Sequence, residues 1–503
     1  MEAGSLWLDV FVTSIPKLRT DTPETIRAVR EVLVAAGFTD HAVAEIFTGV
    51  GKDRTASPWH MHTLMRRTAE PTPFHTLVRL FAFGVEVAED AAEAAVAPMA
   101  LDDWVELGLL RRSGSSAVGS CHIRAFHEDY ICSDFSAATA GPADYVMGVS
   151  PSGKTLAGAT LRHEVGVALD LGTGSGFLAL LLARHSGRVV ATDINPRALD
   201  FARFNAALNG LDLEVRSGSF FEPVADERFD LIVSNPPFVI TPQASHMYMH
   251  GGLDGDGVSQ YITRTAPQLL NEGGYCQFLA SWMVTDESTW EAQLAGWFVD
   301  TGCDVWVLHQ PIVSPEHHTL TWLPTEGNPA AAATDIDDWM AYFGSRGVVG
   351  IGTGLVTMQL NPGGANVIAI DEAPEESTLQ AGTATASGFE VRRWLAAAGE
   401  AELMDTAYRI ADGVRLRQSL RPQRGEGWQP VDATISHTTG YRYEQALDPV
   451  AADLMRRCES GSRLRSVVQN MASEMDSSMD AFVAEAIPVV RRLLLAGFLE
   501  RVR

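Results

Sequence analysis

Lysine is nearly absent from this chain. Of its 503 residues 38 are basic, and only Lys17, Lys52 and Lys154 among them are lysines. Because alanine is abundant as well, we attribute the preference for arginine to a coding bias. The choice of arginine over lysine therefore carries little functional meaning.

Cysteine is scarce too, and its spacing excludes two kinds of small scaffold. The five cysteines are far apart, odd in number and without a CxxC pair: Cys121, Cys132, Cys276, Cys303 and Cys458. Such usage is typical of free thiols in a reducing compartment and excludes a disulfide framework or a zinc ribbon. The group Cys121-His122, His127 and Cys132 matches no zinc spacing either, so we expect no metal site.

Long hydrophobic runs are missing as well. No apolar stretch reaches about 18 residues, the minimum for a membrane-spanning helix. The first residues also lack the basic-then-apolar order of a secretory signal. We therefore expect a cytoplasmic protein with no membrane partner.

Positive charge is in short supply overall, but not everywhere. The 38 basic residues stand against 63 acidic ones, a net charge of −25. Because phosphate binding depends on lysine and arginine, this balance excludes a protein that coats nucleic acid by charge alone. Residues 390–503, however, hold 16 arginines and 16 acidic residues. If the partner is RNA, this neutral, Arg-dense segment is where we expect it to be held.

The length predicts two to four domains, and the local patterns divide the chain into three parts. Residues 1–140 carry helical spacing, with a helix start at Thr22-Pro23, and then period-two alternation over 117–126 and 130–134. Residues 361–503 read as further helices and end in a short strand, so we expect helical, winged-helix-like modules at both ends. Residues 361–390 read as a connection or an irregular crossover.

Residues 141–360 alternate between strands and helices. Apolar strands are predicted at 165–171, 188–194, 213–217, 229–234, 275–280, 304–308 and 355–360, with helices at 176–184 and 196–208 between the first ones. This alternation predicts an α/β domain with a doubly wound, Rossmann-like parallel sheet. Ligands of such sheets bind at the carboxyl ends of the strands.

A glycine-rich turn and an acidic residue follow the first two strands. The first strand runs into Asp170-Leu-Gly172-Thr173-Gly174-Ser-Gly176, where glycines let the backbone pass close to a ligand. The pattern alone also fits a dinucleotide site or a plain tight turn. The second strand ends in Asp193, placed to bind the hydroxyls of a ribose, and Ile194 follows, placed to lie against an adenine.

The fourth strand ends in Ser234-Asn235-Pro236-Pro237-Phe238. Two prolines make this turn rigid, which fixes the Asn235 side-chain oxygen and the Pro236 carbonyl as acceptors. Paired acceptors suit an NH₂ group, since they bind its hydrogens and orient its lone pair toward a methyl sulfonium. Phe238 would stack on a planar target. A dinucleotide dehydrogenase has no use for this arrangement.

The order DLGTGSG, TDIN and SNPPF resembles the class I S-adenosylmethionine-dependent methyltransferases, in the small-domain group of HemK-type glutamine and adenine-type amino-methyltransferases. The resemblance covers about residues 145–360 and implies a seven-stranded sheet with S-adenosyl-L-methionine as cofactor. It assigns the cofactor to Asp170, Gly172, Thr173, Gly174, Gly176, Asp193, Ile194, Ser219 and Asn235, and the nucleophile to Asn235, Pro236, Pro237 and Phe238. Relatives often carry an acidic residue where this chain has Ser219, so its adenine contact departs from theirs.

Three other segments have alternative readings. Residues 148–155 match the phosphate-loop pattern GxxxxGK[ST], yet the next predicted strand begins only about ten residues later, and the resemblance places this stretch over the methionine end of the cofactor. Residues 347–354 are glycine-rich and read as a hairpin between the last strands. Residues 241–257 read as a loop over the substrate or as a plain surface loop.

The acceptor is the least determined feature. We predict N-methylation of a planar exocyclic nitrogen, first a nucleobase amine of RNA or DNA. The alternatives are a HemK-type protein glutamine methyltransferase and a cofactor-binding assembly factor without turnover. The expected partners are accordingly RNA or a ribosomal particle, or a release-factor-like protein. The arginines at 415, 417, 421 and 424 suit RNA, although a solvated face is the favoured explanation of this run.

Overall fold

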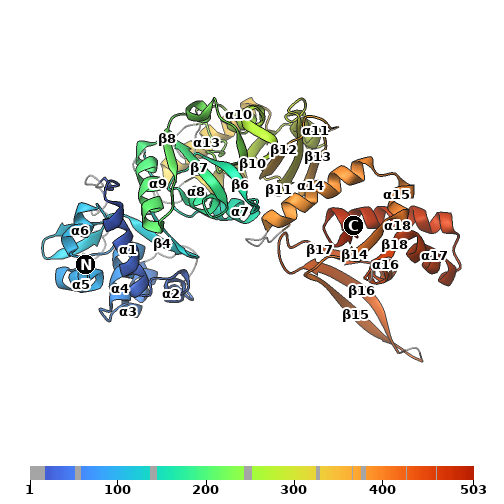
Figure 1. Ribbon diagram of the computed structural model, residues 1–503, viewed down its shortest axis with the longest axis horizontal. Coiled ribbons are helices and arrows are strands. Elements are labelled where there is room, and N and C mark those ends of the chain that lie inside the picture. The colour runs from blue at the N-terminus through green and yellow to red at the C-terminus, as the bar shows by residue number, and fades with distance from the viewer. Residues whose placement is uncertain are drawn as a thin grey trace.

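The computed structural model describes residues 17–50, 58–135, 144–242, 252–323, 329–364, 366–374, 381–425, 427–459 and 461–502. Three parts follow one another along the long axis of the molecule: a helical N-terminal module, a central α/β domain and a C-terminal module (Figure 1). Within the described ranges, no helix is long and apolar enough to span a membrane.

The central domain is built on a mixed, mostly parallel sheet of eight strands. In chain order these are β6 (Val165–Leu171), β7 (Ser186–Asp193), β8 (Glu214–Ser217), β9 (Phe229–Ser234), β10 (Leu270–Val284), β11 (Cys303–His309), β12 (Gly350–Leu360) and β13 (Ile368–Glu372). Their order across the sheet is β13-β11-β12-β10-β9-β6-β7-β8, and β12 is antiparallel to both its neighbours. The alternating strand and helix pattern thus confirms the predicted α/β class.

Three predictions about this sheet are wrong. A parallel sheet was expected, but β12 runs antiparallel to β10 and β11. Seven strands were expected, but β13 pairs in parallel with β11 as an eighth, so the sheet continues past residue 360. The glycines at 347–354 do not form a hairpin, because Gly352 and Gly354 lie inside β12. A Cβ atom at Gly352 would meet the Trp282 ring at 2.1 Å, and one at Gly354 would meet the Leu308 carbonyl oxygen at 2.6 Å. Close packing, not turning, explains these glycines.

Helices cover both faces of the sheet. They are α7 (Pro151–Ala159), α8 (Phe177–Leu182), α9 (Pro196–Asn209), η3 (Glu222–Val224), α10 (Gly257–Thr265), η4 (Ala266–Leu269), α11 (Trp290–Gly296), α12 (Pro315–Trp322) and α13 (Pro329–Ser345). Successive strand residues such as Ala168 and Leu169 enter separate hydrophobic clusters, because side chains alternate across a strand. Helices α12 and α13 connect β11 to β12 in place of the expected hairpin.

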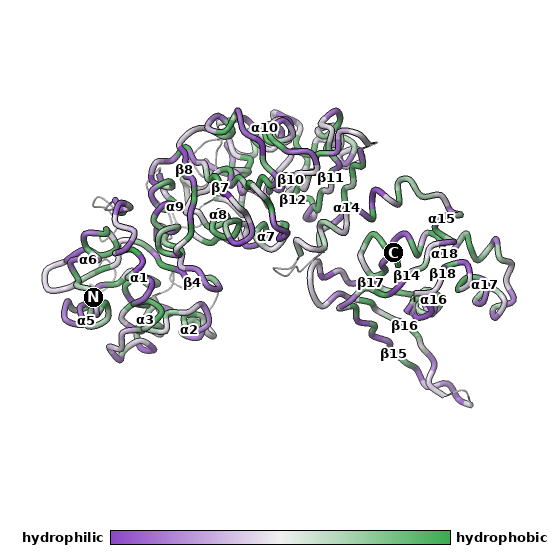
Figure 2. Tube along the Cα trace, in the orientation of Figure 1, coloured by the Kyte–Doolittle hydropathy of each residue, from purple (hydrophilic) through white to green (hydrophobic). Residues whose placement is uncertain are grey.

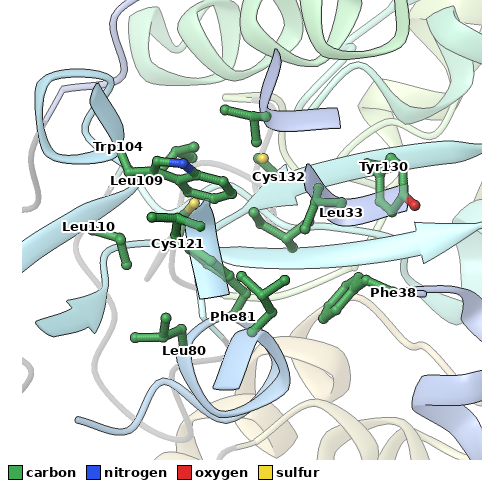
Figure 3. Packing of buried hydrophobic residues seen from close by; sticks show 14 of the residues in the cluster. Leu33, Phe38, Leu80, Phe81, Trp104, Leu109, Leu110, Cys121, Tyr130 and Cys132 are labelled. Carbon is green, nitrogen blue, oxygen red and sulfur yellow. The ribbon is translucent and has the colours of Figure 1, made fainter. Parts of the chain in front are cut away.

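The N-terminal module packs helices around a small sheet. Its elements are α1 (Pro23–Ala35), α2 (Asp40–Ile46), α3 (Pro58–Arg67), α4 (Pro73–Val78), η2 (Arg79–Phe83), β1 (Val87–Ala88), α5 (Glu89–Val96), α6 (Leu101–Glu106), β2 (Leu110–Ser113), β3 (Ser116–Gly119), β4 (His122–Phe126) and β5 (Asp129–Ser133). Its core gathers Leu33, Phe81 and Trp104 (Figure 3). The same core includes Phe201 and Phe204 of α9, so the module and the central domain are packed as one body.

The C-terminal module is joined to the central domain by a long helix. Its elements are α14 (Ala381–Ala397), α15 (Glu400–Asp405), β14 (Ala407–Ile410), β15 (Val414–Gln423), β16 (Gly427–His437), β17 (Glu444–Leu447), α16 (Pro449–Arg457), β18 (Ser462–Arg463), α17 (Leu464–Glu474), α18 (Met479–Leu495) and β19 (Leu499–Arg501). In α14, Phe389 packs in the central core and Leu395 in the C-terminal core. Residues 381–390, expected to belong to a connection or irregular crossover over 361–390, therefore form the first part of a helix.

The two flanking modules share one arrangement of small sheets. In the N-terminal module the antiparallel order is β1-β3-β2, with β1 after α4 and η2, and β2 after α5 and α6. In the C-terminal module it is β18-β14-β19, with β18 after α16, and β19 after α17 and α18. Only the central strand differs in its place along the chain: β3 follows α5, α6 and β2, whereas β14 precedes α16, α17 and α18.

Candidate active site

Three strand ends bring the predicted site residues to one edge of the sheet. Strands β9, β6 and β7 are neighbours and parallel, so their carboxyl ends lie side by side. Asp170 lies near the end of β6, Asp193 ends β7 and Asn235 follows β9. The Ser234 hydroxyl donates to the Leu171 carbonyl oxygen at 2.8 Å, which ties the ends of β9 and β6 together.

Asp170 is fully buried and organises the turn after β6. Its Oδ2 accepts hydrogen bonds from the Thr173 hydroxyl at 2.6 Å and from the Ala179 backbone N–H at 2.9 Å. Its Oδ1 is buried without a hydrogen-bond partner among the described residues. Burial, with a smaller effect of the nearby Asp193 carboxylate, raises the pKa of Asp170 to about 7. An uncompensated acceptor of this kind at a strand end suits a ligand donor.

The three glycines of the turn have different surroundings. Gly172 and Gly174 have positive φ values of 74° and 55°, and a Cβ atom on either would meet nothing within 4 Å. Their backbone therefore faces open space that a ligand can approach. Gly176 also has a positive φ, of 82°, but a Cβ there would lie 3.0 Å from the Cα of Ala202 in α9. Its lack of a side chain serves the packing of α8 against α9, a role not expected from the sequence.

Asp193 and Ile194 adjoin this turn. Asp193 accepts hydrogen bonds from the Gly174 and Asn195 backbone N–H groups, both at 2.8 Å, and its carboxylate keeps further acceptor sites. Burial raises its pKa as well. Ile194 is 60% exposed, an unusual exposure for a large apolar side chain. Ser219 is half-buried just beyond β8, where the Gly218 N–H donates to the Asp193 carbonyl oxygen at 3.1 Å.

The Asn235 amide is held in one orientation. Its Nδ2 donates to the Ser152 hydroxyl at 3.3 Å, and that hydroxyl lies 3.0 Å from the Ser150 hydroxyl. Ser150 in turn caps α7 by accepting from the Gly153 N–H at 2.9 Å. The Asn235 Oδ1 is left buried, without a hydrogen-bond partner in the part of the chain that the structure describes. Pro236 is buried beside it.

Ser150 and Ser152 belong to the segment that matches the phosphate-loop pattern. A phosphate loop directly follows a strand, whereas residues 144–150 form none, and Gly153 and Lys154 lie within the first turn of α7. The segment instead supports Asn235. The resemblance placed this stretch over the methionine end of the cofactor. It did not reveal the contact of Ser152 with Asn235, because the two residues are 83 positions apart in the sequence.

The segment before α7 is tied to both neighbouring elements. Asp134, just after β5, accepts from the Val146 N–H at 2.8 Å and forms an ion pair with Arg197 of α9. The Asn195 amide donates to the Asp144 carbonyl oxygen at 2.9 Å. The N-terminal module thus fixes the position from which Ser150 and Ser152 reach Asn235.

Phe238 lies next to an aromatic side chain of helix α12, and Ile240 lies next to aromatic side chains of α13. The Phe238 ring centroid is 6.5 Å from that of Trp322 in α12, at 87° between planes. The following Ile240 is buried with Trp339 and Phe343 of α13, and its carbonyl oxygen lies 2.9 Å from the His318 ring. Sequence reasoning missed Trp322, since only the α12–α13 connection brings it here. Of the loop expected at 241–257, residues 243–251 lie outside the described ranges.

Three known families match three separate parts of the chain, which correspond to the central domain and the two flanking modules. Residues 151–298 match the methyltransferase small domain. Residues 35–120 and 386–501 match two domains of unknown function, DUF7059 and DUF7782.

Curated relatives match the central part only. A release factor glutamine methyltransferase of Geobacter sulfurreducens is 36% identical over 158 residues, which is 28% of this chain and 53% of that protein. A ribosomal protein uL3 glutamine methyltransferase of Bradyrhizobium diazoefficiens is 39% identical, over 24% of this chain and 42% of that protein. A ribosomal RNA small subunit methyltransferase C of Salmonella arizonae is 38% identical, over 24% of this chain and 32% of that protein. The chain thus spans about half the length of these relatives or less.

Solved structures with similar parts include a methyltransferase from Pyrococcus furiosus. It is 17% identical with a TM-score of 0.26, over 41% of this chain and 80% of that one. The tRNA m1G37 methyltransferase of M. jannaschii is 14% identical with a TM-score of 0.28, over 48% of this chain and 57% of that one. By its matched family and its curated relatives, the central part of this chain belongs to the methyltransferase small domain family of class I S-adenosylmethionine-dependent methyltransferases.

Proposed function

We propose that the chain is an S-adenosylmethionine-dependent N-methyltransferase, and that Asn235 to Phe238 position the nitrogen that is methylated. The observation that carries this proposal is the Asn235 side chain, whose Oδ1 is buried and unpartnered while its Nδ2 is held by Ser152. A buried acceptor without a donor costs free energy, of the order of 1–3 kcal/mol, unless a ligand supplies the donor.

The residues around the β6 and β7 ends fit S-adenosylmethionine. The open backbone at Gly172 and Gly174 would border its methionine part, with Asp170 and Thr173 ordering the turn. Asp193 would accept from its ribose, and the exposed Ile194 would cover one face of its adenine. Ser219 stands where a further adenine contact would be made, and Gly176 acts indirectly through α8. When bound, the cofactor supplies an electrophilic methyl group on a sulfonium.

The residues of the fourth strand end act on the acceptor nitrogen. Asn235 Oδ1 and the Pro236 carbonyl oxygen would accept the two hydrogens of an NH₂ group, which directs its lone pair away from both acceptors. With the cofactor held at the β6 and β7 ends, the nitrogen so oriented would form the N–C bond as the S–C bond breaks, sulfur would keep that electron pair, and one proton would leave the nitrogen for water. Catalysis thus depends on orientation and on acceptors fixed before the reaction.

The acceptor that we propose is a glutamine side-chain amide in a protein of the translation apparatus. Two of the three curated relatives described here carry glutamine methyltransferase in their names, for a release factor and for ribosomal protein uL3. This support reverses the order of our sequence-based prediction, which put a nucleobase first. A nucleobase amine stays the second candidate because the Salmonella relative is named a ribosomal RNA methyltransferase.

We propose winged-helix-like folds for the two flanking modules, which matches their common order of strands and helices. Such modules would present the substrate particle to the central domain. The domain limits 1–140, 141–360 and 361–503 stay a proposal, with the amendment that β13 lies in the central sheet.

Asn235→Ala tests the proposed role directly. We expect transfer of labelled methyl groups to purified release factors or ribosomal particles to fall about 100-fold or more, as for removal of a fixed polar group from other active sites. Calorimetry should give an unchanged affinity for S-adenosylmethionine. Asn366→Ala, an exposed asparagine ahead of β13, is the control and should retain activity. Equal turnover by Asn235→Ala would contradict the assignment, and binding without any turnover by the wild type would favour the assembly-factor alternative.

A further inference from the structure

Strands β15 and β16 form a two-stranded ribbon that projects from the C-terminal module (Figure 1). They pair antiparallel from Val414 and His437 to Gln423 and Gly427. Strand β17 adds a third strand only along Ala433 to Ser436, so within the described ranges the outer half has no further strand beside it. Residues 415–423 of β15 are all exposed. An isolated two-stranded ribbon is marginally stable in water, which makes the outer half suited to a partner.

The two faces of the ribbon differ in chemistry. Arg415, Arg417 and Arg421 lie on one face, because residues at even spacing share a face of a strand. Their direct cross-strand neighbours are Ser436, Thr434 and Gln429, which carry no charge. The same face also holds Asp432, opposite Ser419, and Glu444, opposite Ser436. The hydrophilic stretches of the ribbon are visible along its trace (Figure 2).

The opposite face is apolar. Near the module, Ile435 is buried in the C-terminal core. Toward the tip, Leu420 is 49% exposed and Trp428 is 66% exposed. Trp428 pairs with Pro422, two residues along β15 from Leu420, so both side chains share this face. The tip therefore offers an aromatic surface on one side and Arg421 on the other, while Arg415 and Arg417 lie nearer the module, opposite the part of β16 that pairs with β17.

The arginine face runs against the charge of the whole chain. Among the described residues, no carboxylate lies within 4.0 Å of Arg415 or Arg421, and Arg417 meets Glu444 at 3.4 Å with both side chains largely exposed. A chain with 63 acidic residues has ample opportunity to pair three arginines. Arg415 and Arg421 have no such partner among the described residues, and the exposed Trp428 lies on the other face of the same ribbon. Cations that follow the backbone and aromatic rings that stack on bases are the features of surfaces that bind unpaired nucleic acid.

We propose that the β15–β16 ribbon binds unpaired RNA, with Arg415, Arg417 and Arg421 on the phosphates and Trp428 stacked on a base. Exposed bases stacked on aromatic rings are the usual mode of RNA recognition outside duplexes. This inference goes beyond the proposed methylation, since it concerns where the enzyme holds its substrate particle, whichever group is methylated.

Fluorescence anisotropy with a labelled RNA of about 20 unpaired nucleotides, without S-adenosylmethionine, tests the ribbon. The variant Arg415→Ala/Arg417→Ala/Arg421→Ala should weaken binding about tenfold or more and reduce the slope of log K against log salt by about 2, near 0.7 for each lost contact to a single strand. Trp428→Ala should weaken binding about tenfold and leave that slope unchanged.

The matched control is Arg27→Ala/Arg66→Ala/Arg228→Ala, which removes three exposed arginines elsewhere and should bind as the wild type does. Unchanged thermal unfolding of each variant separates loss of contacts from loss of fold. The proposal is overturned if the ribbon variant binds RNA as tightly as the control variant, or if the wild type binds no RNA. A DNA strand of the same sequence that binds equally well overturns the assignment to RNA. Because no methyl transfer is measured, failure of the proposed activity does not affect this result.

Discussion

At the scale of single residues, the orientation of the Asn235 amide depends on groups outside its own strand. An amide presents its oxygen or its NH₂ to a ligand according to which partner the other end finds. Here Ser152 takes the NH₂ end, and Ser150 holds Ser152 while capping α7. The sequence predicted Asn235 from its motif, but the serines lay in a pattern typical of phosphate loops, and only the fold brings the two together.

Removing the Ser152 hydroxyl should therefore slow the reaction without weakening cofactor binding. In Ser152→Ala the Asn235 amide loses its fixed orientation, and we expect kcat to fall about tenfold while the affinity for S-adenosylmethionine stays as it is. Ser152→Thr retains a hydroxyl and should recover most of the rate. Steady-state kinetics with both variants check this, and a Ser152→Ala enzyme with wild-type kcat would show that the contact is incidental.

Asp170 should make the stability of the ligand-free protein depend on pH. Its pKa of about 7 lies above the usual value of 3.8, so between these values the folded state binds more protons than the unfolded state. Its contribution to the free energy of unfolding is therefore full below pH 3.8. The contribution declines as pH rises above that value and is lost once pH passes the folded-state pKa of about 7.

Asp170→Asn removes this titration, since an asparagine oxygen still accepts from Thr173 and Ala179. Relative to the wild type, the variant should gain stability between pH 5 and pH 8. Urea unfolding of both proteins at several pH values measures the difference. If that difference is the same at every pH, the carboxyl group does not titrate in this range.

At the scale of elements, helix α9 belongs to two domains at once. Its Asn205 is fully buried and accepts from the Cys132 N–H, while its NH₂ group donates to the Cys132 and Ser175 carbonyl oxygens, all within 2.7–2.8 Å. The asparagine thus continues β5 as a further strand would, and ties it to the turn that holds Gly174 and Gly176. Helical periodicity predicted α9 almost to the residue, but no local pattern reveals what a buried asparagine contacts.

Asn205→Ala should destabilise the junction between the N-terminal module and the turn at Gly172 to Gly176. Three buried backbone groups lose their partners, which costs about 1–3 kcal/mol for each one that stays unpaired. We expect a fall of at least about 2 kcal/mol in the free energy of unfolding. Asn209→Ala, one turn on and half-buried, should cost less, because water can replace its contacts. Chemical denaturation measures the free energy of unfolding of both variants. An equal loss of stability in the two would contradict the claim that the burial of Asn205 makes its hydrogen bonds more costly to remove.

Strands were predicted correctly where the sequence has an uninterrupted apolar run. The prediction failed where a segment becomes a strand only through its contacts with distant parts of the chain. Residues 165–171 and 229–234 form β6 and β9 over the predicted ranges. The strand at 368–372 escaped notice because a short Ile-Ala-Ile-Asp-Glu segment has no strand signal until β11 pairs with it. Likewise, glycines that serve close packing against Trp282 look like turn glycines in the sequence.

At the scale of the whole molecule, the central domain is not independent of its neighbours. Phe201, Phe204 and Leu208 of α9 are buried in the core of the N-terminal module, together with Phe38 and Trp104. On the other side, Arg392 of α14 lies 3.8 Å over the Trp306 ring of β11 and pairs with Asp371 of β13. Composition and motifs predicted three parts, but not that they share cores, because contacts between distant segments leave no periodic signal.

A chain that begins at residue 141 should fold poorly, since removal of the N-terminal module exposes the apolar face of α9. We expect loss of solubility or of cooperative unfolding, which gel filtration and circular dichroism detect. A soluble monomer that unfolds cooperatively would show that the shared core is dispensable.

The central claim is that this chain methylates a planar amide or amine nitrogen, first a glutamine of a translation protein. Mass spectrometry of release factors, ribosomal proteins and RNA nucleosides from cells with the wild-type chain, without it, or with Asn235→Ala tests it most directly. The account predicts a methylated glutamine present only with the wild-type chain. Identical methylation of proteins and RNA in all three strains would contradict it.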